Sequence, residues 1–588
     1  MSEKENLELK ETFSVALSEH KKGNFENAEK MYNKILDMEP EHFGAVFLLG
    51  SLQAQIKNFH LANTLLQKAI RLNPNYAEAH YNFGNVLIAM GKEEKAIHSY
   101  QSAIKINPNY ADAHNNLGNL LKKKHKTEEA IHSYKKAIEV NPNYADAYNN
   151  LGAIYMYLKK YNEAEIFYKK SLEIQPNHSF AYNNLGLIFH KVGDYKKAII
   201  QFKKAIKINP DYAEANASLG IIYKEIGDFN NAIACYQKAV KQKPENLLYL
   251  FSLNELTNEI LDVKLKSKII AIMNKEESKN IDLAYGNFLL SNYEMKSKHY
   301  NNEFQLLLKA HSFYFKSKKY SFQNKVKYWL EDLPGIKKKM DLNKIIKKTK
   351  INILNINPIF IIGVPRCGST LIEKIIGSST KFIPIGEETS IITDVIADLA
   401  KNNHLERANI ENIIYEKYQN KGLVIEESNQ IFTDKSLENF YYLNLIKDIF
   451  PNAKIINCKR DILSSIVSII KNNLVALPWA HDLENIFSYF NIYYNMVLDF
   501  EKSSPNLIFN IQYENLVNNP EIESKKLLKF CELPWDKKCL EFYKNENIIS
   551  KTASNIQVRK PIYKNSLNKY LPYESFLKEY KKKYKWFN

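Results

Sequence analysis

Residues 145–177 have the sequence ADAYNNLGAIYMYLKKYNEAEIFYKKSLEIQPN, and the same arrangement of small, aromatic and proline residues returns every 34 residues through the first half of the chain. Each unit contains two helical stretches, and a proline follows the second. A small residue at a fixed position lets two helices approach closely, and proline stops the second helix before the next begins. The stretch therefore predicts an array of stacked helical hairpins.

The register of the array is fixed by three series of residues. Prolines recur at Pro40, Pro74, Pro108, Pro142, Pro176, Pro210 and Pro244. Glycines recur at Gly50, Gly84, Gly118, Gly152, Gly186 and Gly220, and alanines twelve residues later at Ala96, Ala130, Ala164, Ala198 and Ala232. Seven units are predicted to start near Leu9, Phe43, Ala77, Ala111, Ala145, Ser179 and Ala213. This helix-turn-helix unit resembles the tetratricopeptide repeat, which implies an all-α superhelix with a concave surface.

Asparagine occupies one repeat position four times, at Asn82, Asn116, Asn150 and Asn184, and Asn115, Asn149 and Asn183 precede three of them. A row of amides could hydrogen-bond the backbone of an extended peptide, as the similar ladder in the repeats of protein O-GlcNAc transferases implies. The alternative is that asparagine is simply common in this repeat. A peptide or protein in the groove is the partner that the ladder favours.

After Pro244 the period is lost, although helical patterning continues, which predicts degenerate hairpins that cap the array. The Lys-rich stretch 337–350 is the predicted boundary. The predicted domains are a repeat solenoid over residues 1–244, capping hairpins over 245–349, and a third domain over 350–588.

The third domain has short β-branched runs followed by helices, which predicts α/β architecture with a parallel sheet. The run 359–364 predicts a buried strand, and the loop Pro365-Arg-Cys-Gly-Ser-Thr370 leads into a helical stretch over 371–377. Such a loop points backbone N–H groups at an anion. Ser369 stands where the Walker A pattern has lysine, so the loop suits a phosphate but not nucleoside triphosphate hydrolysis.

The loop resembles the 5'-phosphosulfate loop of sulfotransferases that use the donor PAPS and release PAP. The resemblance assigns five loop residues to donor binding, namely Arg366, Cys367, Gly368, Ser369 and Thr370. A second element supports it: Arg460 follows the predicted strand 453–458, and Ser468 lies eight residues later, as in the family's 3'-phosphate site. Taken alone, the Arg460–Asp461 pair would fit a structural salt bridge equally well.

Further motifs are similar to those of tyrosylprotein sulfotransferases and of bacterial sulfotransferases fused to repeats. Glu388 in Gly-Glu-Glu-Thr matches the family's general base, and Lys435 matches a lysine that contacts the leaving oxygen. Ser554 matches a catalytic serine, while Lys569 and Tyr513 match donor-binding residues. The sequence departs from the family at Cys367, where serine is usual, and at Ile462-Leu463, where Gly-Arg is usual.

These residue types suit sulfuryl transfer to a hydroxyl. A carboxylate within hydrogen-bond reach can take the acceptor's proton, which is the role predicted for Glu388. Arg366, Lys435 and Ser554 would stabilise negative charge that grows on the donor oxygens as the S–O bond breaks. The transferred group carries less charge than a phosphoryl group, so no metal is expected. A tyrosine in a protein or peptide is the predicted acceptor, with a glycan as the second reading and an inactive nucleotide-binding adaptor as the third.

Bulk properties constrain the setting. The five cysteines form no Cys-x-x-Cys pair, so neither a zinc site nor a disulfide framework is predicted. The charged amino terminus and the absence of a long apolar stretch predict a cytoplasmic protein without a membrane span. The net charge of +17 fits either an anionic partner or lysines on solvated helix faces, and no basic strip indicates nucleic acid. The oligomeric state stays open, with a homodimer among the alternatives.

Overall fold

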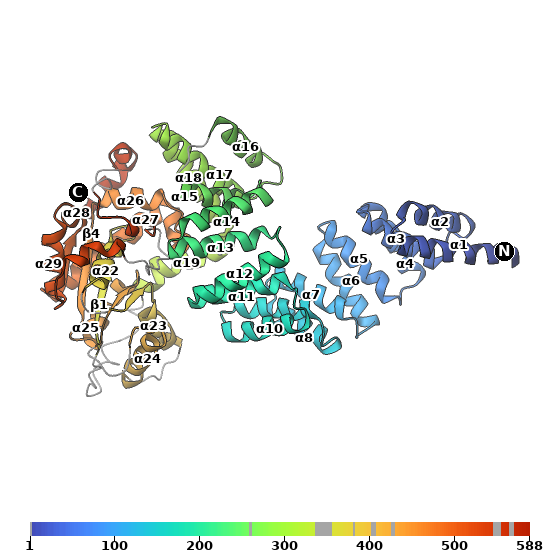
Figure 1. Cartoon of the computed structure of the whole chain (residues 1–588), viewed down its shortest axis with the longest axis horizontal. Coiled ribbons are helices and arrows are strands. Elements are labelled where there is room, and N and C mark those ends of the chain that lie inside the picture. Colours follow the sequence, from blue (N-terminus) through green and yellow to red (C-terminus); the bar gives the residue numbers. More distant parts are fainter. Residues whose placement is uncertain are drawn as a thin grey trace. The chain divides into compact units, whose positions relative to one another are not determined.

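A computed structural model describes residues 3–257, 262–335, 356–379, 383–401, 407–424, 430–544, 554–563 and 570–587 of the chain (Figure 1). The described chain separates into two compact units, Met1–Leu219 and Gly220–Asn588. The first unit is built of helices alone, and the second combines further helices with a five-stranded sheet. The predicted domain limits at residues 244 and 350 stay predictions, and the Lys-rich stretch 337–350 lies outside the described residues.

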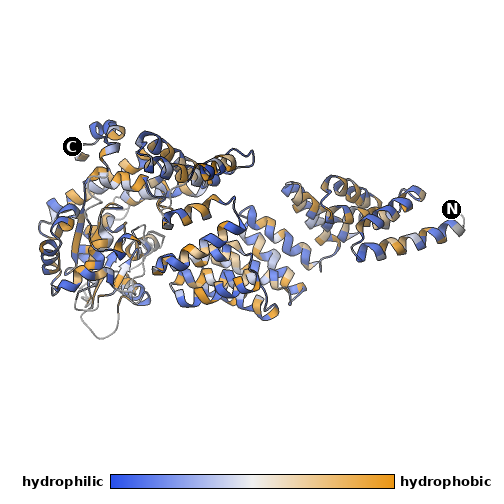
Figure 2. Cartoon of the chain, turned by 45° about the horizontal axis from the view of Figure 1, so that its top comes forward, coloured by the Kyte–Doolittle hydropathy of each residue, from blue (hydrophilic) through white to orange (hydrophobic). Residues whose placement is uncertain are grey.

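The repeat helices confirm the predicted solenoid. They are α1 (Glu3–Lys21), α2 (Phe25–Met38), α3 (Phe43–Gln55), α4 (Phe59–Leu72), α5 (Ala77–Ala89), α6 (Glu93–Ile106), α7 (Ala111–Lys123), α8 (Thr127–Val140), α9 (Ala145–Tyr157), α10 (Tyr161–Ile174), α11 (Ser179–Val192), α12 (Tyr195–Ile208), α13 (Ala213–Ile226) and α14 (Phe229–Gln242). Six of the seven predicted unit starts coincide with the first residue of a helix, and only α1 begins earlier, at Glu3 instead of Leu9. Figure 2 shows that these helices carry hydrophilic and hydrophobic residues alternately along their length.

The repeated glycines have a packing role. A Cβ atom added at Gly84, Gly118 or Gly152 would lie 2.6, 2.7 or 2.9 Å from the Cε1 atom of the tyrosine sixteen residues later. Those tyrosine rings are almost fully buried between the two helices of each hairpin. The close helix approach that the small residues predict is therefore real, and it serves to seat one aromatic ring per unit.

Within the described residues 245–327, five helices follow the repeats, and their role as capping hairpins stays a prediction. They are α15 (Leu247–Thr257), α16 (Val263–Met273), α17 (Asn280–Lys296), α18 (Tyr300–Ser317) and α19 (Lys319–Lys327). Their buried side chains belong to the same hydrophobic cluster as the sheet, so this helical region and the sheet share one core.

The sheet is parallel, with the order β2-β3-β1-β4-β5. Its strands are β1 (Ile356–Ile362), β2 (Ile385–Glu387), β3 (Gln430–Lys435), β4 (Lys454–Lys459) and β5 (Ile508–Gln512). The helices around it are α22 (Ser369–Gly377), α23 (Ile391–Lys401), α24 (Arg407–Asn420), α25 (Leu443–Ile449), α26 (Ile462–Ile470), α27 (Leu483–Ser503), α28 (Tyr513–Asn518), α29 (Pro520–Phe530) and α30 (Lys578–Lys583). The two predicted strands are present with ends one to three residues away from the predicted ones.

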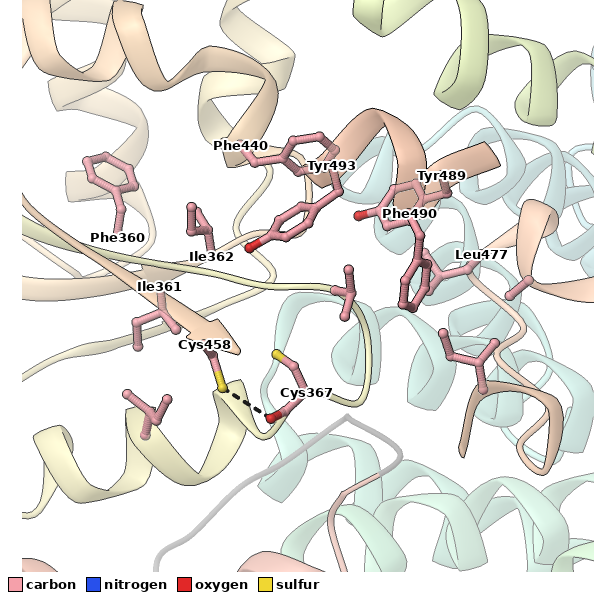
Figure 3. Packing of buried hydrophobic residues seen from close by; sticks show 14 of the residues in the cluster. Phe360, Ile361, Ile362, Cys367, Phe440, Cys458, Leu477, Tyr489, Phe490 and Tyr493 are labelled. Atoms are coloured by element: carbon pink, nitrogen blue, oxygen red, sulfur yellow. Dashed lines mark hydrogen bonds between the residues drawn. The ribbon is translucent and has the colours of Figure 1, made fainter. Parts of the chain in front are cut away.

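The central strands are buried, which explains their continuous apolar sequences. In β1 every residue except Asn357 is fully buried, and Ile359 pairs with Thr433 of β3 and with Lys454 of β4. Figure 3 shows Ile362 and Phe440 beside Tyr493, whose hydroxyl donates to Asn457 of β4 over 2.5 Å. This core fixes the strand ends from which the candidate site is built.

Candidate active site

The candidate residues gather at one edge of the sheet because all five strands are parallel and their carboxyl ends meet there. Glu387 ends β2 and pairs in register with Lys435, which ends β3. The loop 365–370 follows β1 in the middle of the sheet, Arg460 follows β4, and Tyr513 follows β5. The strand order therefore arranges the predicted base, the predicted lysine, the loop and the predicted donor-binding residues side by side.

The loop after β1, residues 365–370, has left-handed backbone at Gly368 and Arg366. Gly368 has φ of +104° and caps α22, and Arg366 has φ of +69°. A Cβ atom at Gly368 would lie 2.4 Å from the ring of Tyr513, so only glycine allows that ring to pack on the loop. Arginine in this conformation costs about 1–3 kcal/mol, and such strain is concentrated at functional sites.

The Arg366 side chain is held by three neutral oxygens. Its Nε donates to Ser468 Oγ over 3.0 Å, Nη1 donates to Ser554 Oγ over 2.9 Å, and Nη2 donates to Gln557 Oε1 over 3.4 Å. Ser468 lies on α26, as predicted. The structure thus brings together residues from three distant parts of the sequence around one guanidinium group.

Arg460 binds the loop from the neighbouring strand. Its Nη1 donates to the Arg366 carbonyl over 2.8 Å, and its guanidinium carbon lies 4.6 Å from the centre of the Tyr513 ring. Asp461 caps α26 by accepting the Ser464 N–H, which gives the aspartate of the Arg-Asp pair a role of its own.

A pocket lies around these groups. Six of the predicted residues line it, namely Arg366, Gly368, Thr370, Arg460, Tyr513 and Ser554. It is also lined by Gln557, Lys560 and Tyr563, for which the sequence analysis gave no role. All three lie within ten residues of Ser554, so the motif that supplied Ser554 already contained the signal.

Positive charge gathers at the pocket. Burial, followed by the nearby Arg460 charge, lowers the pKa of Arg366 to about 10. The three side-chain partners of Arg366 are uncharged, and Lys560 adds a further cation to the lining. Guanidinium forks and hydroxyls of this kind match phosphate and sulfate oxygens, so the residues present fit an anionic donor.

The predicted base and lysine form a second group. Lys435 is almost fully buried, and its Nζ lies 3.4 Å from Glu387 Oε1 and 3.6 Å from Glu388 Oε1. Glu388 keeps 42% of its side chain exposed and has φ of +53°. Burial raises the pKa of Glu388, Lys435 lowers it, and Glu387 raises it. A carboxylate with a raised pKa and access to solvent is suited to accept a proton.

Asp434 holds the chain segments of this second group in place through hydrogen bonds to its carboxylate. It is fully buried, and its carboxylate accepts hydrogen bonds from four residues. These are Thr389, Tyr418, Ser436 and Asn439. Because Thr389 follows Glu388 directly and Asp434 precedes Lys435, the network fixes both chain segments that carry the predicted base and lysine.

Two predicted donor residues are placed differently and one cannot be placed. Cys367 is fully buried below the loop, where its carbonyl accepts from Cys458 Sγ over 3.1 Å and its N–H donates to Val364 (Figure 3). The Cys367 side chain therefore belongs to the core. Ser369 begins α22 but does not line the pocket, and Lys569 lies outside the described residues.

In the first unit the asparagines bond one another across neighbouring repeats. Asn150 Nδ2 donates to Asn115 Oδ1 and Asn184 Nδ2 donates to Asn149 Oδ1, each over 3.0 Å. Asn115 and Asn149 are buried, whereas Asn150 and Asn184 are half-buried. The ladder thus links neighbouring repeats.

Comparisons with known proteins agree with this geometry. Residues 358–537 match the sulfotransferase family model. These residues form a sulfotransferase-family domain. Tetratricopeptide repeat models match residues 84–125, 118–159, 143–211 and 213–246, and residues 21–103 match the model for subunit 3 of the anaphase-promoting complex.

Three relatives are similar to parts of this chain. An uncharacterized protein of Aquifex aeolicus (strain VF5) is 31% identical over 314 residues, which cover 50% of this chain and 40% of the relative. Protein-tyrosine sulfotransferase A of Caenorhabditis elegans is 25% identical over 240 residues, covering 36% of this chain and 60% of the relative. Protein-tyrosine sulfotransferase of Drosophila melanogaster is 26% identical over 249 residues, covering 36% and 46%. The chain spans less than two thirds of each of these relatives.

Within the described residues, no group of three or more His, Cys, Asp or Glu side chains could hold a metal ion. Among the helices of the described ranges, none is both long and apolar enough to cross a bilayer.

Proposed function

We propose that the sulfotransferase-family domain transfers a sulfuryl group from PAPS to a hydroxyl, most favourably that of a tyrosine in a protein or peptide. The observation that supports the proposal most directly is the environment of the Arg366 guanidinium group. Arg366 has strained backbone, lines a pocket with two further cations, and donates to neutral oxygens of the described residues, an arrangement that favours an anionic ligand.

Residues of this chain would bind the donor at both of its phosphate groups. Arg366, the α22 amino terminus and Thr370 suit the 5' end, and Arg460 with Ser468 suits the 3'-phosphate. Tyr513 and Tyr563 offer aromatic surface in the same pocket, close to both arginines. The donor supplies an activated sulfuryl group when it is bound.

Glu388 would take the acceptor proton as the acceptor oxygen forms its bond to sulfur. The bond from sulfur to the bridging phosphate oxygen breaks in the same step, and its electron pair stays on that oxygen. Lys435, Arg366 and Ser554 would donate hydrogen bonds to the oxygens on which this charge develops. The proton ends on Glu388, whose raised pKa suits that role at neutral pH.

The tyrosine acceptor rests on the Gly386-Glu-Glu-Thr389 turn and on the two named relatives that are protein-tyrosine sulfotransferases. Tetratricopeptide repeats bind proteins, so we propose that the repeat groove presents the acceptor and that half-buried amides such as Asn150 contact its backbone.

The test combines donor binding with transfer. The chain is titrated with PAP by calorimetry, and radiolabelled sulfate from PAPS is followed into a host-cell lysate separated into protein and glycan fractions. We expect micromolar PAP binding and label in protein that maps to tyrosine. Label confined to glycans would contradict the acceptor, and failure to bind PAP would contradict the donor.

A further inference from the structure

The segment that carries Ser554 is held from two sides. On the pocket side, Ser554 and Gln557 accept hydrogen bonds from Arg366. The segment itself is a single tight turn, η5 (Gln557–Arg559), in which the N–H groups of Gln557 and Val558 both donate to the Ser554 carbonyl. Short turns of this kind are weak alone, so outside contacts decide the position of Ser554.

The other side is supplied by the seventh repeat. Asn555 Nδ2 donates to the Lys224 carbonyl over 2.8 Å, and Arg559 Nη2 donates to the Glu225 carbonyl over 2.8 Å. Arg559 Nε also donates to Asn555 Oδ1 over 2.9 Å, which joins the two side chains. Lys224 and Glu225 lie in the last turn of α13, where helix carbonyls lack intrahelical partners and attract a cation.

The turn after α13 is shaped for this contact. Gly227 has φ of +88°, and a Cβ atom there would lie 2.4 Å from Arg559 Cζ. Gly193, one repeat earlier, has nearly the same φ of +86° but has no atom within 4 Å of such a Cβ. The equivalent positions in other repeats hold Lys57, His125 and Lys159, so the repeat itself does not require glycine there.

We propose that Asn555 and Arg559 are positioning residues, and that the end of α13 is a structural part of the active site. They bind the α13 carbonyls, and this contact holds Ser554 against Arg366. The inference rests on the proposed function, because it gives the seventh repeat a role in catalysis in addition to any role in acceptor binding.

The first test uses the matched glycines in the full-length chain. Gly227→Ala and Gly193→Ala carry the same backbone cost, and only the former displaces Arg559. We expect Gly227→Ala and Arg559→Ala to lower kcat for transfer to a simple phenol at least tenfold, with KM for PAPS changed less than threefold. Gly193→Ala should keep kcat within twofold of the unchanged chain. Equal kcat in the two alanine variants would overturn the proposal.

A double-mutant cycle separates positioning from general stability. If Arg559 acts through Ser554, the combination Ser554→Ala/Arg559→Ala should lose no more than about twofold beyond Ser554→Ala alone. Arg559→Lys should recover part of the loss, because lysine can donate to one carbonyl. Fully multiplicative losses would show that Arg559 does not work through Ser554.

Hydrogen exchange gives a readout that needs no activity. Amides of residues 554–563 should exchange at least tenfold faster in Gly227→Ala and Arg559→Ala than in Gly193→Ala. Unchanged exchange would contradict the contact itself. If the variants show this exchange difference but the unchanged chain transfers no sulfate, the proposed function is contradicted while the α13 contact is supported.

Discussion

Arg366 and Glu388 both have left-handed backbone, with φ of +69° and +53°. This conformation costs a residue with a Cβ atom about 1–3 kcal/mol, so the surrounding structure must impose it. At Glu388 the neighbouring residue holds the backbone in this conformation, because the Thr389 hydroxyl donates a hydrogen bond to the buried carboxylate of Asp434. In this conformation Glu388 Oε1 lies 3.6 Å from Lys435 Nζ, and the Glu388 side chain stays partly exposed to solvent.

Glu388→Gln should lower kcat by a factor of 100 or more while PAP affinity stays within threefold, because only proton transfer is removed. The control is Glu387→Gln, since Glu387 lies at nearly the same distance from Lys435. Steady-state transfer and PAP calorimetry measure both. A larger loss in Glu387→Gln than in Glu388→Gln would exchange the roles of the two glutamates.

The same pair of variants gives a pH readout. With Glu388 as the proposed base, transfer needs its ionised form, so activity should fall as the pH drops through its pKa, which burial raises. Because the Glu387 charge also raises that pKa, Glu387→Gln should move the acid limb of kcat to lower pH. An acid limb that does not move would show that another group controls it.

Residues with a motif of their own could be predicted from the sequence, whereas residues defined by contact could not. Arg366, Arg460 and Ser468 were predicted and do meet in space. Arg559 was not, because the Glu225 carbonyl that it binds belongs to a residue more than 300 positions earlier in the chain. Lys560 and Tyr563 were missed although they stand in the Ser554 motif, because a lysine or tyrosine in a loop is commonplace.

At the scale of elements, periodicity determined what could be predicted. Six helix starts agree to the residue because every repeat carries the same small, aromatic and proline positions. β2 was not predicted, since three residues, Ile385–Glu387, give no alternating pattern, and only pairing with β3 makes them a strand. That pairing nevertheless decides the site, because it brings the predicted base to Lys435.

Two buried histidines join α18 to the sheet domain and make its stability depend on pH. His311 Nδ1 lies 2.9 Å from His481 Nδ1, and His311 Nε2 donates to the Ile470 carbonyl. Burial lowers the pKa of His311 to about 4, and burial with the neighbouring His311 lowers that of His481 to about 3. Both are therefore neutral in the folded chain at pH 5, while the unfolded chain binds protons below about 6.5.

The unfolded state then holds more protons between about pH 4 and 6.5, so stability should fall as the pH falls through this range. The expected loss at pH 5 is roughly 2 kcal/mol per histidine. Chemical unfolding followed by tryptophan fluorescence measures it, because all four tryptophans (Trp329, Trp479, Trp535 and Trp586) lie in the second unit. His311→Gln/His481→Gln should be less stable at pH 7 but show a shallower slope. Parallel slopes would contradict the assignment.

Across the whole molecule, charged side chains on the exposed helix faces are arranged differently from those in the pocket. Many repeat lysines pair with glutamates one turn away on exposed helix faces, such as Lys30 with Glu26 and Lys136 with Glu139. Such pairs contribute little to stability, and because each pair is neutral the paired lysines do not account for the net charge of +17. In the pocket, by contrast, three cationic residues lie together, namely Arg366, Arg460 and Lys560.

The proposed roles of the repeats predict that a shortened chain separates acceptor binding from chemistry. Residues 179–588 retain α11 and α12 ahead of α13, so Tyr212 and Ala215 keep their contact with Ala205, and the α13 carbonyls still bind Asn555 and Arg559. This chain should transfer sulfate to a simple phenol with kcat within about twofold of the full chain. Its labelling of lysate proteins should fall at least tenfold, because the amide ladder of α7 and α9 is gone.

Equal labelling of lysate proteins by the two chains would show that the first repeats do not present the acceptor. A loss of phenol transfer with unchanged tryptophan fluorescence would instead place part of the catalytic site in the deleted repeats.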